Sequence, residues 1–217
     1  MRLVPNICVL AGPAGSGKGH FGQLLRESGD LPYGLTRSHT TRARLARDHD
    51  DSYFWVSEGE MDELIAKGEM LECKTIHGNR YGTSVAEIHR VVDEGKVPLL
   101  DIDIQGVREI GSRLAQEGQG RLVFCAFMAI TTTLCRTAQI ERHRKSLKGA
   151  DGPAEPADLE ARLLTAAWEL EEAGRMARED PTATGFVVER FVNQIRTPER
   201  TAELLDRLQE FYRKAGR

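Results

Sequence analysis

A glycine-rich segment near the start of the printed sequence carries residue types that bind phosphate. Residues 12–18 are Gly-Pro-Ala-Gly-Ser-Gly-Lys, which fits the pattern G-x-x-x-x-G-K. Glycines allow several backbone N–H groups to turn toward phosphate oxygens without Cβ clashes, and the lysine can then reach the outer phosphates. Because the segment follows the apolar run 7–11 and opens a helical pattern, it predicts a nucleotide-phosphate loop between a buried strand and a helix.

The two residues after this lysine depart from the usual pattern. A serine or threonine is expected there to supply a hydroxyl to Mg²⁺, whereas Gly19 and His20 follow Lys18. Magnesium prefers oxygen ligands, so His20 is a poor ligand for it. We expect either that phosphates, water and a distant carboxylate hold the ion, or that activity is reduced.

A second series of polar and aromatic residues follows between residues 38 and 106. It consists of Ser38-His39-Thr40-Thr41-Arg42, Arg44, Tyr53-Phe54-Trp55-Val56-Ser57, Glu72, His77-Gly78-Asn79-Arg80-Tyr81-Gly82-Thr83 and Leu100-Asp101-Ile102-Asp103-Ile104-Gln105-Gly106. In this order, and after the glycine-rich loop, the series closely resembles the guanylate kinase family of P-loop nucleoside monophosphate kinases. The resemblance covers residues 9–107 and is weaker from Leu122 onward.

This resemblance implies a binding site for GMP that agrees with the chemistry of the residues. Arginine forks suit a phosphate dianion, carboxylates suit the N1–H and N2–H₂ donors of guanine, and a hydroxyl suits its O6. Glu72 and Asp103 fit the second role and Thr83 the third. The implied GMP-binding residues are Ser38, Arg42, Arg44, Tyr53, Glu72, Tyr81, Thr83 and Asp103.

The resemblance also implies the donor site and the residues that assist phosphoryl transfer. Asp101 is expected to hold Mg²⁺, the cofactor that accompanies ATP, through a water molecule. The expected catalytic residues are Lys18, Arg42, Arg142 and Arg162, although Arg136 and Arg144 fit the same role as Arg142. The expected ATP-binding residues are Gly12, Pro13, Ala14, Gly15, Ser16, Gly17, Lys18, Gly19, His20 and Asn193.

Hydrophobic patterning predicts an α/β fold in which strands alternate with helices. Strands are expected at 7–11, 97–104, 122–128 and 186–192, and helices at 17–27, after Ser57, after Ser84, at 158–179 and after Thr197. Asp101 and Asp103 interrupt one apolar strand, where unpaired carboxylates would be costly, which favours a functional role. We therefore expect a P-loop NTPase fold with a parallel β-sheet flanked by helices. A single domain is expected, with a core of residues 1–36, 95–134 and 159–217, a GMP-binding insert of 37–94 and a lid of 135–158.

Composition excludes several other classes of protein. The 217 residues carry a formal charge of −3, so no basic field for nucleic acid is expected. No apolar run reaches the ~18 residues of a membrane span, and we expect a cytoplasmic monomer or homodimer with Cys8 and Cys125 as buried thiols.

These patterns lead to a hypothesis and three alternatives. The hypothesis is ATP-dependent phosphorylation of GMP, and also of dGMP, to the diphosphate in purine nucleotide metabolism. The alternatives are a related kinase with another phosphate acceptor, a guanylate-kinase-like binding module that has lost catalysis, and a regulatory P-loop NTPase without an acceptor. His20 favours the second alternative, while Asp101 and the intact loop oppose it.

Overall fold

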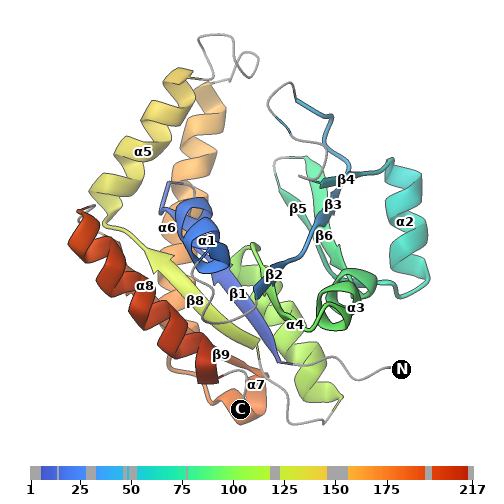
Figure 1. The fold of residues 1–217 in the computed structure, drawn as a ribbon. Helices are drawn as coiled ribbons and strands as arrows, with labels where there is room; N and C mark the ends of the chain where they lie inside the picture. The colour runs from blue at the N-terminus through green and yellow to red at the C-terminus, as the bar shows by residue number, and fades with distance from the viewer. Residues whose placement is uncertain are drawn as a thin grey trace.

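Within the described residues the strands form two β-sheets, and the larger sheet lies between two layers of helices. A computed structural model describes residues 6–13, 15–27, 33–45, 48, 53–76, 78–117, 123–145, 156–193 and 197–214. Five strands lie in the order β2-β7-β1-β8-β9, and every neighbouring pair is parallel (Figure 1). The predicted α/β fold is confirmed. The strands are β1 (Ile7–Ala11), β2 (Tyr33–Leu35), β7 (Val97–Leu100), β8 (Val123–Ala129) and β9 (Phe186–Val192).

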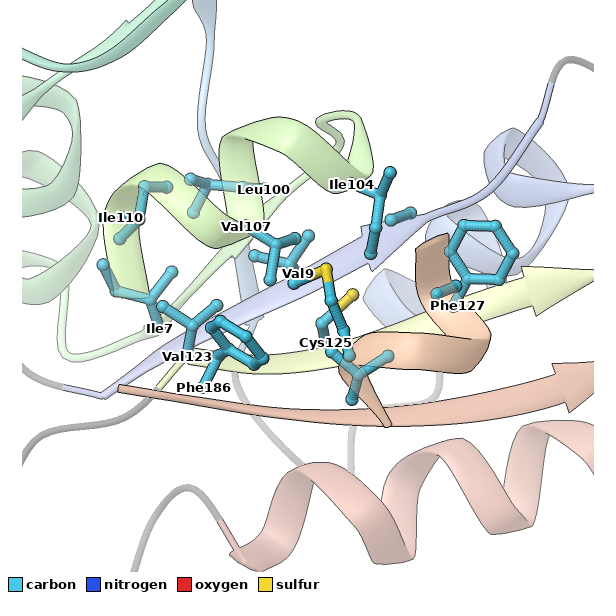
Figure 2. Packing of buried hydrophobic residues seen from close by; sticks show 14 of the residues in the cluster. Ile7, Val9, Leu100, Ile104, Val107, Ile110, Val123, Cys125, Phe127 and Phe186 are labelled. Carbon is cyan, nitrogen blue, oxygen red and sulfur yellow. The ribbon is translucent and has the colours of Figure 1, made fainter. Parts of the chain in front are cut away.

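Helices cover both faces of this sheet because its strands are apolar on both sides. Alternate residues of β1 enter opposite clusters: Ile7 and Val9 pack with α4 and α6, and Cys8 and Leu10 pack with α1 and α8. Figure 2 shows the first cluster, in which side chains of α4 point onto the strands. The four helices are α1 (Lys18–Glu27), α4 (Ile104–Gln116), α6 (Pro156–Met176) and α8 (Pro198–Arg213).

A smaller mixed sheet lies beside the larger one. Its strands follow the order β4-β3-β6-β5, with β3 and β4 parallel and the other pairs antiparallel. On α4, Arg113 Nη1 donates to the Met70 carbonyl at 3.0 Å, which joins this sheet to the core. The elements here are β3 (Ser38–Thr40), β4 (Tyr53–Trp55), α2 (Glu58–Ala66), β5 (Met70–Ile76), β6 (Asn79–Ser84) and α3 (Val85–Asp93).

The remaining described helices are α5 (Thr132–Lys145) and α7 (Pro181–Thr184). Helices α5 and α6 pack along each other, and residues 146–155 between them lie outside the described part of the chain. Of the helices that the structure describes, none has both the length and the apolar character needed to span a membrane.

The strand predicted at 97–104 is wrong in its second half. Strand β7 ends at Leu100, and Asp103 caps the N-terminus of α4 by accepting a hydrogen bond from the Gly106 N–H at 2.7 Å. Asp101 is exposed rather than buried within a strand. The apolar run therefore contains a strand, a short loop and the start of a helix, which periodicity over so few residues does not separate.

Helix starts are otherwise close to their predicted positions. Ser57 forms a complete capping box with Glu60, and Thr197 caps α8 with proline in its first turn. At Ser84 only half of the box forms, since the Glu87 carboxylate instead accepts from the Arg37 N–H at 2.8 Å. Glu87 thus links α3 to the segment that enters the smaller sheet.

Candidate active site

One cleft brings together most of the residues singled out from the sequence. Its volume is about 790 Å³, and its walls come from the glycine-rich loop, the smaller sheet, the end of β7, α5 and α6. The predicted residues that line it are Gly12, Pro13, Gly15, Gly17, Lys18, Gly19, Ser38, Tyr53, Glu72, Tyr81, Asp101, Asp103 and Arg162.

The loop wall depends on glycine for its backbone conformation. Gly12, Gly15 and Gly17 have φ of 137°, 89° and 100°, a region that other L-residues rarely adopt. A Cβ on Gly12 would also lie 2.5 Å from the Met128 carbonyl oxygen, so close packing against β8 excludes any side chain. Asn193 Nδ2 donates to the Ser16 carbonyl at 2.7 Å and holds the loop against the end of β9.

Lys18 faces the cleft at the start of α1. Its Nζ lies 3.5 Å from Asp101 Oδ1 at the carboxyl end of β7, and the two side chains are 23% and 49% exposed. The pair is thus open to solvent and to a ligand. A cation beside the helix N-terminus attracts phosphate, and the neighbouring carboxylate can accept a hydrogen bond from a metal-bound water.

The opposite wall contains a buried carboxylate. Glu72 on β5 is 4% exposed, and burial raises its pKa to about 7, although hydrogen bonding by Thr83 opposes the rise. Thr83 lies across from Glu72 on β6 and is fully buried. Asp103 lies in the same cleft, and its charge adds to the rise. Two carboxylates therefore converge where donors of a ligand could bind.

The tyrosines and arginines of the smaller sheet separate into two groups. Tyr53 and Tyr81 meet edge to face at 6.1 Å between ring centroids and line the cleft with Ser38. Arg42 does not line it; its guanidinium lies 5.3 Å from the Tyr53 ring centroid and 3.0 Å from the Asp48 carboxylate. Desolvation opposes a rise in the Arg42 pKa, but the hydrogen bond and charge of Asp48 outweigh it and raise the pKa.

Several other predicted residues lie outside the cleft wall. Arg44 stacks 4.8 Å from the centroid of Trp55, and His20 is exposed at the first turn of α1, edge to face with Phe21. Ala14 and the side chain of Arg142 lie outside the described part of the structure.

Helix α6 contributes a carboxylate that the sequence analysis missed. Glu169 lines the cleft, is 8% exposed, and has a pKa raised to about 7 by burial, with the charge of Lys18 opposing the rise. Arg162, Thr165, Ala166 and Glu169 all line the cleft. Their spacing of three, four and seven residues marks one helix face, so Arg162 could have pointed to Glu169. Lys74 on β5 also lines the cleft and was likewise not predicted as a site residue.

The loop, the parallel sheet and the two flanking helix layers define the class of protein as a P-loop nucleotide-binding fold. Comparison with known sequences then identifies the family. A sequence model described as guanylate kinase matches residues 4–146, which is more than half of the chain. The protein therefore belongs to the guanylate kinase family.

Similar proteins agree with this assignment. Guanylate kinase 1 of Oryza sativa subsp. japonica is 41% identical over 103 residues, 47% of this chain and 27% of that protein. Guanylate kinase of Streptomyces coelicolor is 38% identical over 122 residues, 56% of this chain and 60% of that protein. The matched region thus spans less than two thirds of each relative. The crystal structure of guanylate kinase from Anaplasma phagocytophilum, at 22% identity, shares the fold with a TM-score of 0.60 over 97% of this chain and 86% of that one.

Proposed function

We propose that this protein is a guanylate kinase that transfers the terminal phosphoryl group of ATP to GMP. One observation carries the proposal. A phosphate-binding loop on one wall of the cleft faces, on another wall, the buried carboxylate of Glu72 and the Tyr53–Tyr81 pair. The cleft is thus suited to two phosphorylated ligands whose phosphates meet between its walls.

The loop is the proposed site of ATP. Its backbone N–H groups and the N-terminus of α1 would bind the phosphates, and Lys18 would contact the outer ones. Asn193 acts through the Ser16 carbonyl and keeps the loop in place. Arg162, which faces the same cleft from α6, would neutralise charge that develops on the phosphoryl group in transit.

The donor set near the loop suits Mg²⁺ held mainly by phosphate and water. Within the described residues no three ligating side chains converge on one point, but Asp101 offers an exposed carboxylate beside Lys18. Asp101 would therefore hold the ion through water, whereas His20 does not fit as a ligand. When bound, Mg²⁺ neutralises charge on the phosphate oxygens.

The smaller sheet is the proposed site of GMP. Glu72 and Asp103 would accept hydrogen bonds from the guanine N–H groups, and Ser38, Tyr53 and Tyr81 would contact the phosphate. We assign residues 37–94 as the GMP-binding insert and 135–158 as the lid. In the transfer, an oxygen of the GMP phosphate bonds to the terminal phosphorus of ATP. The bond between that phosphorus and the β–γ bridging oxygen breaks, and ADP leaves with the bridging oxygen. Positioning in line and charge neutralisation suffice, without a general base.

Arg42 would complete the phosphate site by exchanging partners. In the structure it is paired with Asp48 while lying over Tyr53, next to the proposed phosphate position. In the present pair a single guanidinium nitrogen, Arg42 Nη2, contacts both Asp48 oxygens at 3.2 and 3.0 Å. An incoming phosphate would offer two oxygens to two guanidinium nitrogens, which is the stronger bidentate geometry. We therefore keep Arg42 as a proposed catalytic and GMP-binding residue.

The second candidate is a binding module that has lost catalysis, which the exposed His20 favours because it supplies no oxygen to the metal. An ADP-release assay with ATP and Mg²⁺ separates the two, with GMP, dGMP, AMP, UMP and CMP as acceptors. Turnover highest with GMP and dGMP supports the kinase. GMP binding without acceptor-dependent ADP release would support the binding module.

A further inference from the structure

Lys74 lies on the wall of the cleft that we assign to the acceptor base. Glu72, Lys74 and Ile76 alternate along β5, and all three line the cleft. Residues two apart on a strand share a face and lie about 7 Å apart. The Lys74 side chain therefore projects from the same face of β5 as the Glu72 carboxylate.

An ion pair with Glu109 on α4 restrains the position of the Lys74 ammonium. Lys74 Nζ contacts Glu109 Oε2, which projects from α4, while Lys74 itself is 27% exposed. An ammonium has three N–H donors, so one bond to Glu109 leaves others for a ligand in the cleft. Glu109 thus holds a hydrogen-bond donor at the junction of β5 and α4.

Guanine needs such a donor on a different edge from the one that carboxylates recognise. Its N1–H and N2–H₂ groups are donors, whereas O6 and N7 are acceptors, and a lysine contact to O6 and N7 is a common way to select guanine. Adenine carries an N6–H₂ donor in place of O6, which a lysine would oppose. Thr83, the hydroxyl expected to contact O6, is fully buried beside Glu72, whereas Lys74 lines the cleft and adds a charged donor on the same face of β5.

We propose that Lys74 recognises the O6 and N7 edge of the acceptor purine, while Glu72 recognises its N–H donors. This inference rests on the proposed use of GMP as acceptor. It makes Lys74 a residue that determines specificity, and Glu109 a positioning residue that acts through it.

Isothermal titration calorimetry of the full chain with three ligands tests this assignment. The ligands are GMP, 7-deaza-GMP, which lacks N7, and 2-aminopurine riboside 5′-monophosphate, which lacks O6 and with it the N1–H donor. We expect Lys74→Met to weaken GMP binding about 10- to 100-fold and to reduce the preference for GMP over at least one analogue. Glu109→Gln should give the same pattern with a smaller change.

Lys67→Met is the matched control, because Lys67 forms an ion pair with Glu63 on α2 and is 59% exposed. It should leave all three affinities unchanged. If Lys74→Met weakens the three ligands equally, or changes none of them, the ion pair with Glu109 is structural and the proposal is overturned. Absence of GMP binding by the unaltered protein would instead overturn the proposed function, so the two failures are distinguishable.

Discussion

The two walls of the cleft are built in different ways. The loop wall comes from one short segment of the chain, with Gly12, Pro13, Gly15, Gly17, Lys18 and Gly19 lining the cleft, and its backbone conformation depends on glycines with positive φ. The opposite wall is made of side chains from Ser38 to Asp103 on several strands and a helix start. Backbone groups recognise phosphate whatever nucleotide carries it, whereas side chains select one base.

The walls also differ in charge. Lys18 gives the loop wall a cation near a helix N-terminus, while Glu72 gives the other wall a buried carboxylate whose pKa is raised to about 7. The contrast agrees with one wall for the triphosphate of ATP and another for the donor groups of guanine. It also predicts that substitutions in each wall change different measurable quantities.

The largest effect is expected at the cation of the loop wall. Lys18→Ala should reduce kcat about 10²- to 10³-fold, because it removes charge stabilisation at the transferred phosphoryl group. Its unfolding midpoint should change little, since the pair with Asp101 is exposed. Steady-state kinetics and urea denaturation measure both, with Lys96→Ala on the surface as control. An unchanged kcat would rule out the proposed role of Lys18.

Glu72→Gln should affect the acceptor and leave ATP binding unchanged. We expect GMP binding to weaken roughly 10- to 100-fold, because an amide cannot accept from both N–H groups as a carboxylate does. GMP favours the ionised carboxylate, so GMP affinity of the unaltered protein should rise with pH and level off above about 7.

The glutamine variant should lack the part of this pH dependence that Glu72 causes, while titration of the GMP phosphate remains in both proteins. Calorimetry between pH 5 and 8 measures the difference. Equal pH profiles would contradict the assignment of Glu72 to the base.

Although Glu72→Gln should weaken GMP binding, it should stabilise the folded protein at high pH. A carboxyl whose pKa is raised by folding stabilises the fold fully below its unfolded value of about 4.5, and this contribution is lost as pH rises through about 7. The glutamine does not ionise, so the variant should avoid this loss. The free energy of unfolding of Glu72→Gln minus that of the unaltered protein should therefore be larger at pH 8 than at pH 5, by up to about 3 kcal/mol. Urea denaturation at both pH values measures the change. A variant that loses stability equally at both would indicate disrupted packing instead.

Two glycines of the loop wall form a matched pair. Gly12→Ala should destabilise the fold by about 1–3 kcal/mol, because Gly12 has φ of 137° and a new Cβ would meet the Met128 carbonyl. Gly19→Ala should be neutral or slightly stabilising, since Gly19 lies in the first turn of α1 with nothing within 4 Å of the Cβ position. Thermal unfolding of both variants checks the contrast. Similar losses at the two sites would contradict the structure of the loop.

The smallest effect is expected at His20. Because the loop wall binds phosphate mainly through its backbone, His20→Thr should raise kcat by less than about tenfold and lower the Mg²⁺ concentration needed for half-maximal rate. Kinetics over a Mg²⁺ titration measures this. A much larger gain would mean that the natural histidine severely limits catalysis and would favour the binding-module alternative.

Features that depend only on neighbouring residues could be predicted from the amino-acid sequence. The strand at 7–11, the glycine-rich loop, the capping box at Ser57 and the strand at 186–192 all follow from local periodicity, φ preferences and short hydrogen bonds. For the same reason the family resemblance is specific, since its motifs are short runs such as 12–18 and 77–83.

Which side chains share the cleft depends on how distant parts of the chain pack, and the sequence did not predict it for every residue. Glu169 and Lys74 reach it because α6 and β5 both border the cleft, and Arg42 turns to Asp48 although its motif position suggested the cleft. The short loop at Asp101–Asp103 was likewise hidden within an apolar run, because burial alone does not distinguish a strand from a buried helix start. Local rules fix backbone conformation, but burial, pKa and partner choice depend on contacts between residues far apart in the chain.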